Sequence, residues 1–216
     1  MEKRTIDPYI EPLILYAVLF FRFPSGSGQI PELVEFSIFA EIIRILSNNL
    51  PSLALIWYLL FKSWRLRKAD IAFSPKNDIS SLALSLPALV IIGLTISVVS
   101  NLDGIQTGPR YTAPENAVSW IILGFSCLTT AYLEESYFRF YLLTKRVEMG
   151  ISPYRIVVIS TLMFSVCHAY AGPWGFLNAA FSGAVLAIVF LRFRSLHGIA
   201  LAHALYNILV YTFSAV

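Results

Sequence analysis

Seven apolar segments, separated by polar loops, follow one another along this chain of 216 residues. About 20 consecutive apolar residues suffice for a helix that crosses a lipid bilayer. Charged residues make up 13% of the chain, about half their usual share in a soluble domain, and 57% hydrophobic content excludes a disordered chain. We therefore predict an all-α fold: a single polytopic bundle of about seven or eight transmembrane helices. The segments are approximately Tyr9–Phe23, Leu33–Phe61, Ile79–Val99, Asn116–Leu143, Pro153–Tyr170, Trp174–Leu191 and Leu196–Phe213.

Local signals refine several segments. We expect kinks, not helix ends, at Pro51 and Pro87, because neighbouring helices can satisfy the carbonyl that a proline frees. Ser152 and Pro153 form a typical helix start. Residues 30–48 are amphipathic, and we expect them to lie along the membrane interface before the chain turns inward at Pro51. The first segment, which basic residues precede, also fits a signal peptide.

Basic residues are distributed unequally between the loops. With a cytoplasmic N-terminus, twelve of the 16 Lys and Arg residues lie on the cytoplasmic side, whereas Arg22 and Arg110 lie outside and Arg44 and Arg139 lie within segments. Cytoplasmic loops carry such an excess of Lys and Arg. The short chain points to a prokaryotic source, so we expect a multi-pass protein of the cytoplasmic membrane with its N-terminus inside. The twelve are Lys3, Arg4, Lys62, Arg65, Arg67, Lys68, Lys76, Lys145, Arg146, Arg155, Arg192 and Arg194.

Ionisable side chains inside apolar segments are costly and are usually functional. The fourth segment carries two adjacent glutamates and an arginine, the fifth carries a histidine, and the seventh carries a histidine and an asparagine. We interpret an asparagine in the sixth segment, Asn178, as a helix–helix hydrogen bond. The other candidate site residues are Glu134, Glu135, Arg139, His168, His203 and Asn207.

Helical spacing groups these side chains. Glu135 and Arg139 are four residues apart, so they share a helix face and can pair. Glu134 is turned by about 100° from its neighbour and can face a cavity instead. His203 and Asn207 are also four apart and can point at one target.

Glu134, His168 and His203 are also expected at a common depth. At 1.5 Å per residue they lie about 17, 20 and 14 Å from the nearest cytoplasmic basic residues. The hydrocarbon core is about 30 Å thick, so we predict a catalytic cavity near the bilayer midplane. A purely structural cluster is the alternative, but it would leave one carboxylate without a countercharge at a cost of about 2.5–3.5 kcal/mol. Interhelical hydrogen bonds contribute only about 0.6 kcal/mol each to stability.

The residue types suggest a hydrolytic reaction. A carboxylate and an imidazole that converge on one point can deprotonate a water, and a histidine and an asparagine can stabilise the resulting oxyanion. An HExxH zinc motif is absent, and the four aspartates lie outside the apolar segments. A Ser182–His203 dyad is weakly indicated, but it leaves the glutamates unexplained. Cys127 and Cys167 have no disulfide or metal spacing, and Cys167 points about 100° away from adjacent His168.

The ordered motifs EExxxR, FxxxH and HxxxN, at residues 134–139, 164–168 and 203–207, resemble the CAAX protease and bacteriocin-processing family. The eukaryotic members of this family are the type II CAAX prenyl endopeptidases. The resemblance covers about residues 116–213, which we assign to the protease core. Residues 1–115 hold the N-terminal transmembrane helices and the amphipathic segment, and they match nothing specific.

The resemblance implies a glutamate intramembrane endopeptidase that needs no metal or other cofactor. Glu134 would be the catalytic base, and His168 would share its water. His203 and Asn207 would form the oxyanion hole. Glu135 and its paired arginine would position the site.

Two other hypotheses remain open. A zinc hydrolase could use Glu134, His168 and His203 as ligands, because these side chains suit zinc. A non-catalytic membrane immunity or scaffold protein is the other, because the family includes members linked to bacteriocin self-protection. The expected partners are the lipid bilayer and a membrane-associated peptide or protein substrate, prenylated or unmodified. No nucleotide or nucleic-acid motif is present, and the sequence does not indicate an oligomeric state.

Overall fold

The computed structural model describes residues 9–20, 33–64, 73–102 and 110–214. The expected end of the first segment at Phe23 lies outside these residues, as do Lys3, Arg4, Arg22, Arg65, Arg67 and Lys68. The helical elements in chain order are α1 (Ile10–Leu19), α2 (Ile38–Ile43), η1 (Arg44–Asn49), α3 (Leu50–Trp64), α4 (Pro75–Leu102), α5 (Ala117–Glu135), η3 (Ser136–Tyr141), α6 (Leu142–Lys145), α7 (Pro153–Cys167), η4 (Ala169–Ala171), α8 (Gly172–Phe193) and α9 (Leu196–Ser214).

All seven predicted segments form helices in the described part of the chain, although the second begins with a two-residue strand, Leu33–Val34. Five helical stretches are long and apolar enough to cross a membrane, and α1 and α7 are shorter apolar helices. The predicted all-α polytopic bundle is therefore confirmed, and the protein is a multi-pass membrane protein. The five stretches are Ile38–Phe61, Pro75–Leu102, Ala117–Lys145, Ala169–Phe193 and Leu196–Phe213.

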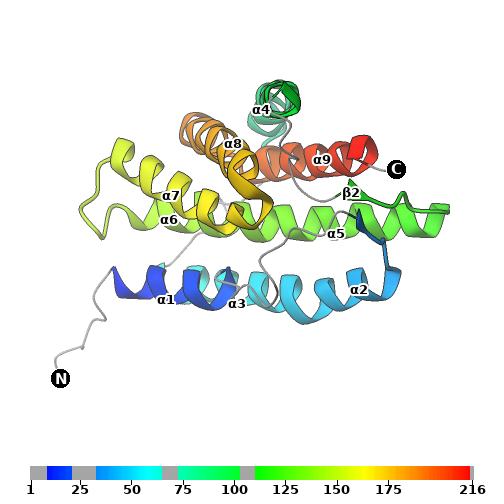
Figure 1. Cartoon of the computed structure of the whole chain (residues 1–216). Helices are drawn as coiled ribbons and strands as arrows, with labels where there is room; N and C mark the ends of the chain where they lie inside the picture. Colours follow the sequence, from blue (N-terminus) through cyan, green and yellow to red (C-terminus); the bar gives the residue numbers. More distant parts are fainter. Residues whose placement is uncertain (1–8, 21–32, 65–72, 103–109, 215–216) are drawn as a thin grey trace.

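The helices are stacked in tiers around α5 (Figure 1). α1, α2 and α3 lie on one side of the long helix that contains α5. α9 packs on the other side of α5, α8 packs on α7 and η3, and α4 covers both α8 and α9. A minimal parallel strand pair, β1 (Leu33–Val34) with β2 (Arg110–Tyr111), links the chain before α2 to the chain before α5. Because α5 lies between the two tiers, its side chains can meet residues from both.

Two helical stretches widen into π-helical turns. η1 joins α2 to α3, and η3 joins α5 to α6 directly after Glu135. Such turns occur mostly inside α-helices and often mark functional sites. The wide turn η1 also precedes Pro51, where it relieves the clash between the proline ring and the carbonyl four residues earlier.

The helix ends agree with the sequence in part. Neither Pro51 nor Pro87 ends a helix, and Ser152 caps α7 at the backbone NH of Arg155, with Pro153 as the first helical residue. The expected turn inward at Pro51 is wrong. Ile38–Phe61 is one continuous helical stretch of 24 residues, because the wide turn absorbs the proline.

α1 is held in the bundle by polar contacts as well as by aromatic packing. Lys145 is buried, and its Nζ lies 2.8 Å from Glu11 Oε1. The hydroxyl of Tyr141 donates to the same carboxylate at 2.7 Å, and that of Tyr137 donates to the carbonyl of Pro12 at 2.6 Å. The first apolar segment is therefore packed as part of the fold, against the helix that carries the glutamate pair.

Candidate active site

The predicted pair of Glu135 and Arg139 is present and completely buried. Arg139 Nη1 lies 3.1 Å from Glu135 Oε1, and both side chains have no exposed surface. Arg139 also donates from Nη2 to the carbonyl of Gly183 on α8 at 3.2 Å. Its guanidinium carbon lies 4.3 Å from the ring centroid of Phe164, a cation–π distance. The pair therefore connects α5 and η3 to both α7 and α8.

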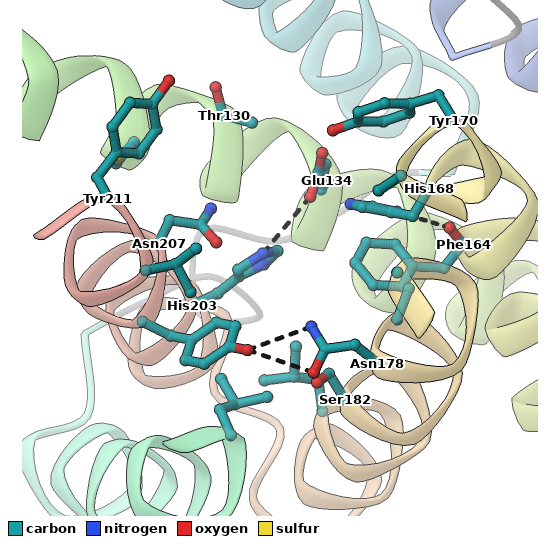
Figure 2. Close-up of a pocket in the computed structure, with 18 of the residues that line it drawn as sticks. Thr130, Glu134, Phe164, His168, Tyr170, Asn178, Ser182, His203, Asn207 and Tyr211 are labelled. Atoms are coloured by element: carbon teal, nitrogen blue, oxygen red, sulfur yellow. Dashed lines mark hydrogen bonds and ion pairs between the residues drawn. The ribbon is translucent and has the colours of Figure 1, made fainter. Parts of the chain in front are cut away.

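His203 bridges the two adjacent glutamates. Its Nδ1 lies 2.8 Å from Glu135 Oε1, and its Nε2 lies 3.6 Å from Glu134 Oε2 (Figure 2). A carboxylate only accepts hydrogen bonds, so Nδ1 carries a proton. The position of Nε2 beside Glu134 favours a second proton on this nitrogen, because a protonated Nε2 is a donor that attracts the carboxylate. An unprotonated Nε2 would direct its lone pair at the carboxylate and repel it.

Glu134 turns away from its neighbour and lines a cavity, as its helical position predicts. Its side chain is 15% exposed, in contrast to the completely buried Glu135. The cavity has a volume of about 270 Å³. Residues of η1, α4, α5, α7, α8 and α9 line it, so it lies between the tiers of the bundle.

His168 is the residue at the C-terminal cap of α7, and Nδ1 lies 2.8 Å from the carbonyl oxygen of Phe164. Because a carbonyl only accepts, Nδ1 carries the proton and Nε2 of the neutral ring is an acceptor. Figure 2 shows the ring edge of His168 directed toward Glu134 across the cavity. Phe164 packs on this ring at a centroid distance of 4.5 Å and forms part of the wall, as expected.

Asn207 lines the cavity one helical turn after His203, and both project from α9 (Figure 2). The structure thus brings four of the predicted site residues, from three helices, to one cavity. The other two form the buried pair behind them, in which Glu135 contacts His203 and Arg139 contacts Glu135.

Three alternatives can be compared with the geometry. Asn178 exchanges hydrogen bonds with Tyr206 of α9 at 3.2 and 3.3 Å, which is the predicted helix–helix contact. Ser182 lines the cavity, but its hydroxyl has no hydrogen-bond partner among the described residues. Both ring nitrogens of His203 contact the two glutamates, so a Ser182–His203 dyad is absent from the described residues. Cys167 points toward α1, where its thiol lies 3.4 Å from the hydroxyl of Tyr16.

Sequence reasoning missed cavity residues that lie outside the three motifs. Arg44, at the start of η1, is the most informative, because it was noted only as an arginine inside an apolar segment. That position was itself a usable signal, since charged residues in such segments usually mark sites. The other residues missed in the lining include Thr130, Tyr170, Tyr206 and Tyr211.

A multi-pass helical membrane protein with a cavity lined by Glu, His and Asn side chains is the class that this fold and site define. Residues 116–209 match the family described as "Type II CAAX prenyl endopeptidase Rce1-like". The resemblance stated from the motifs is therefore confirmed, because the matched segment is similar to the Rce1-like family over the residues that carry those motifs. All six predicted site residues lie within the match. The chain has no match among the curated proteins and none among the solved structures.

Proposed function

We propose that this protein is an intramembrane endopeptidase that cleaves a membrane-associated peptide with water activated by Glu134 and His168. The observation that supports this most directly is the meeting of Glu134, His168, His203 and Asn207 at one cavity. A general base must lie within reach of the water that it deprotonates. The acceptor Nε2 of His168 and the carboxylate of Glu134 face the same space.

The proposed reaction balances without a covalent enzyme intermediate. The water oxygen forms a bond to the peptide carbonyl carbon while its proton passes to Glu134. The negative charge moves to the carbonyl oxygen, where Nε2–H of His203 and the amide of Asn207 donate hydrogen bonds. Glu134 then returns the proton to the leaving nitrogen, and the carbon–nitrogen bond breaks. The products are a carboxylic acid and an amine.

Glu135 and Arg139 are positioning residues in this mechanism. Glu135 fixes the ring of His203 through Nδ1, so that Nε2 points toward the cavity. Arg139 compensates the charge of Glu135 inside the bundle. This pair is neutral as a unit, so a doubly protonated His203 supplies the positive charge that balances Glu134 at the cavity.

We further propose that the reaction needs no metal ion. Within the described ranges, no group of three or more His, Cys, Asp or Glu side chains is placed to hold one. The zinc hypothesis is tested by metal analysis of the purified protein and by the effect of a chelator. Stoichiometric zinc together with loss of activity on chelation would overturn the metal-free proposal and leave the site assignment in place.

The test of the function is cleavage of a CAAX-type peptide by the purified protein in detergent, with prenylated and unmodified forms compared. Glu134→Gln keeps the size of the side chain but removes the base, so cleavage should fall to background. Glu115→Gln makes the same change at an exposed position before α5 and should leave cleavage intact. If the protein is instead a non-catalytic immunity or scaffold protein, no peptide is cleaved and Glu134→Gln leaves its biological function unharmed.

We also propose a cytoplasmic N-terminus in a prokaryotic cytoplasmic membrane. The positive-inside distribution of twelve basic residues supports this orientation. Reporter fusions to the loop before α4 and to the loop before α5 should report opposite sides of the membrane, with the first loop inside. The reverse result would overturn the orientation without affecting the proposed chemistry.

A further inference from the structure

Arg44 brings a positive charge to the cavity from outside the family-matched segment. It begins η1, and Thr130 and Tyr211 line the same part of the wall. Among the described lining residues, Arg44 is the one with a permanently charged cation. Figure 2 shows Thr130 and Tyr211 on the opposite side of Glu134 and His203 from Asn178.

Contacts on the side away from the cavity fix the orientation of this guanidinium. Arg44 is paired with Glu41, and it donates to the fully buried hydroxyl of Ser126 from Nη2 at 2.6 Å and from Nε at 3.2 Å. Tyr211 also forms a side-chain hydrogen bond with Arg44. Neither Glu41 nor Ser126 lines the cavity. Two of the groups that hold Arg44 therefore lie outside the cavity lining, whereas Arg44 itself and Tyr211 belong to it.

The exposed fractions separate this pair from a purely structural one. The Arg44 side chain is 34% exposed and that of Glu41 is 11% exposed, whereas Arg139 and Glu135 are both completely buried. Arg44 also belongs to the cavity lining, whereas Arg139 does not. Guanidinium groups bind carboxylates by paired, charge-assisted hydrogen bonds.

The spacing along α5 gives the helix rise between the residue that holds this cation and the proposed catalytic base. Cys127, Thr130 and Glu134 recur at intervals of three and four residues, and all line the cavity, so one face of α5 forms its floor. Ser126, which holds Arg44, precedes Glu134 by eight residues, or about 12 Å of helix. An extended peptide of three residues spans about 10 Å.

We propose that Arg44 binds the free α-carboxylate of the peptide segment that is released on cleavage. The subsite favours peptides whose released segment ends in a free carboxylate over those whose end is blocked. This inference rests on the proposed endopeptidase function and names a specificity residue for it. In this arrangement the N-terminal helices recognise the C-terminus of the substrate peptide, and the family-matched segment carries out the chemistry.

The test compares two farnesylated peptides that end in cysteine and three further residues and differ only at the terminus, as free carboxylate or carboxamide. The wild-type protein should cleave the carboxylate with at least about tenfold higher kcat/KM. In Arg44→Gln this ratio should fall toward one, because the carboxylate loses its partner. Arg44→Lys should keep part of the ratio, because lysine retains the positive charge but cannot form the paired hydrogen bonds of a guanidinium. Arg155→Gln, which removes an exposed guanidinium, should keep all of it.

Each outcome bears on one of the two proposals. Equal cleavage of both peptides by the wild type, or an unchanged ratio in Arg44→Gln, overturns the subsite and leaves the endopeptidase intact. An equal loss for both peptides in Arg44→Gln and in Arg44→Lys also overturns it, because that result is the signature of a structural pair. Cleavage of neither peptide by the wild type counts against the proposed function itself.

Discussion

His203 Nδ1 lies 2.8 Å from Glu135 Oε1, and the same oxygen lies 3.1 Å from Nη1 of Arg139. One carboxylate oxygen therefore holds both an imidazole of α9 and a guanidinium of η3. The contact with His203 orients a ring that faces the cavity. The contact with Arg139 compensates the charge of a buried guanidinium.

Glu135→Gln separates these two roles. We expect kcat to fall at least about tenfold, because His203 loses the negative charge that holds its Nδ1–H and orients its ring. Stability should fall by up to about 3–5 kcal/mol, because Arg139 stays buried without a counterion. Adding Arg139→Gln should restore part of the melting temperature but not the activity. Cleavage assays and thermal unfolding in detergent measure both; full activity of the single variant would contradict the positioning role.

Asn207→Ala tests the proposed oxyanion contact. Loss of one such donor typically lowers kcat by about 10²–10³-fold, and the melting temperature should hardly change, because Asn207 faces the cavity. Asn178→Ala is the matched comparison, since it breaks the bond to Tyr206 and should cost about 1 kcal/mol of stability. A small effect of Asn207→Ala on kcat would remove this residue from the mechanism.

Gly183→Ala should disturb the buried pair from the side of α8. An added Cβ would lie 3.0 Å from a ring carbon of Phe164 and 3.2 Å from Nη2 of Arg139, so the arginine must shift. We expect lower activity with a modest loss of stability. Gly124→Ala on α5 meets nothing within 4 Å and should stabilise its helix by up to about 1 kcal/mol. Equal behaviour of the two variants would show that the tight contact is unimportant.

Glu11→Gln should destabilise the protein by about 1–2 kcal/mol, because Lys145 is buried and its partner is only 27% exposed. The Tyr141 hydroxyl also loses a charged acceptor. Because these contacts lie away from the cavity, the folded fraction should keep its kcat. Thermal unfolding gives the stability, and activity per folded molecule gives kcat. An unchanged melting temperature would mean that the pair does not hold α1 in the bundle.

The sequence predicted what depends on local spacing. The Glu135–Arg139 pair follows from an interval of four residues on one helix, and the start of α7 follows from Ser152 and Pro153. The seven apolar segments follow from runs of apolar residues and from the length that a bilayer crossing requires. These features need no knowledge of how the helices pack.

Features that depend on packing could not be predicted in the same way. The bridge from His203 to both glutamates requires the rotation of α9 relative to α5, which no spacing encodes. Arg44 reaches the cavity from a helix that carries no motif and lies 82 residues before its partner Ser126. The π-helical turn after Glu135 likewise has no local signal, because neighbouring helices determine it.

The measurement that tests the account most directly is cleavage of a prenylated CAAX-type peptide in detergent by the wild-type protein, Glu134→Gln and Glu115→Gln. Mass spectrometry of the products identifies the broken bond, and thermal unfolding checks that all three proteins are folded. The account predicts a single cleavage site, background activity for Glu134→Gln and full activity for Glu115→Gln. Wild-type activity in a folded Glu134→Gln variant would contradict it.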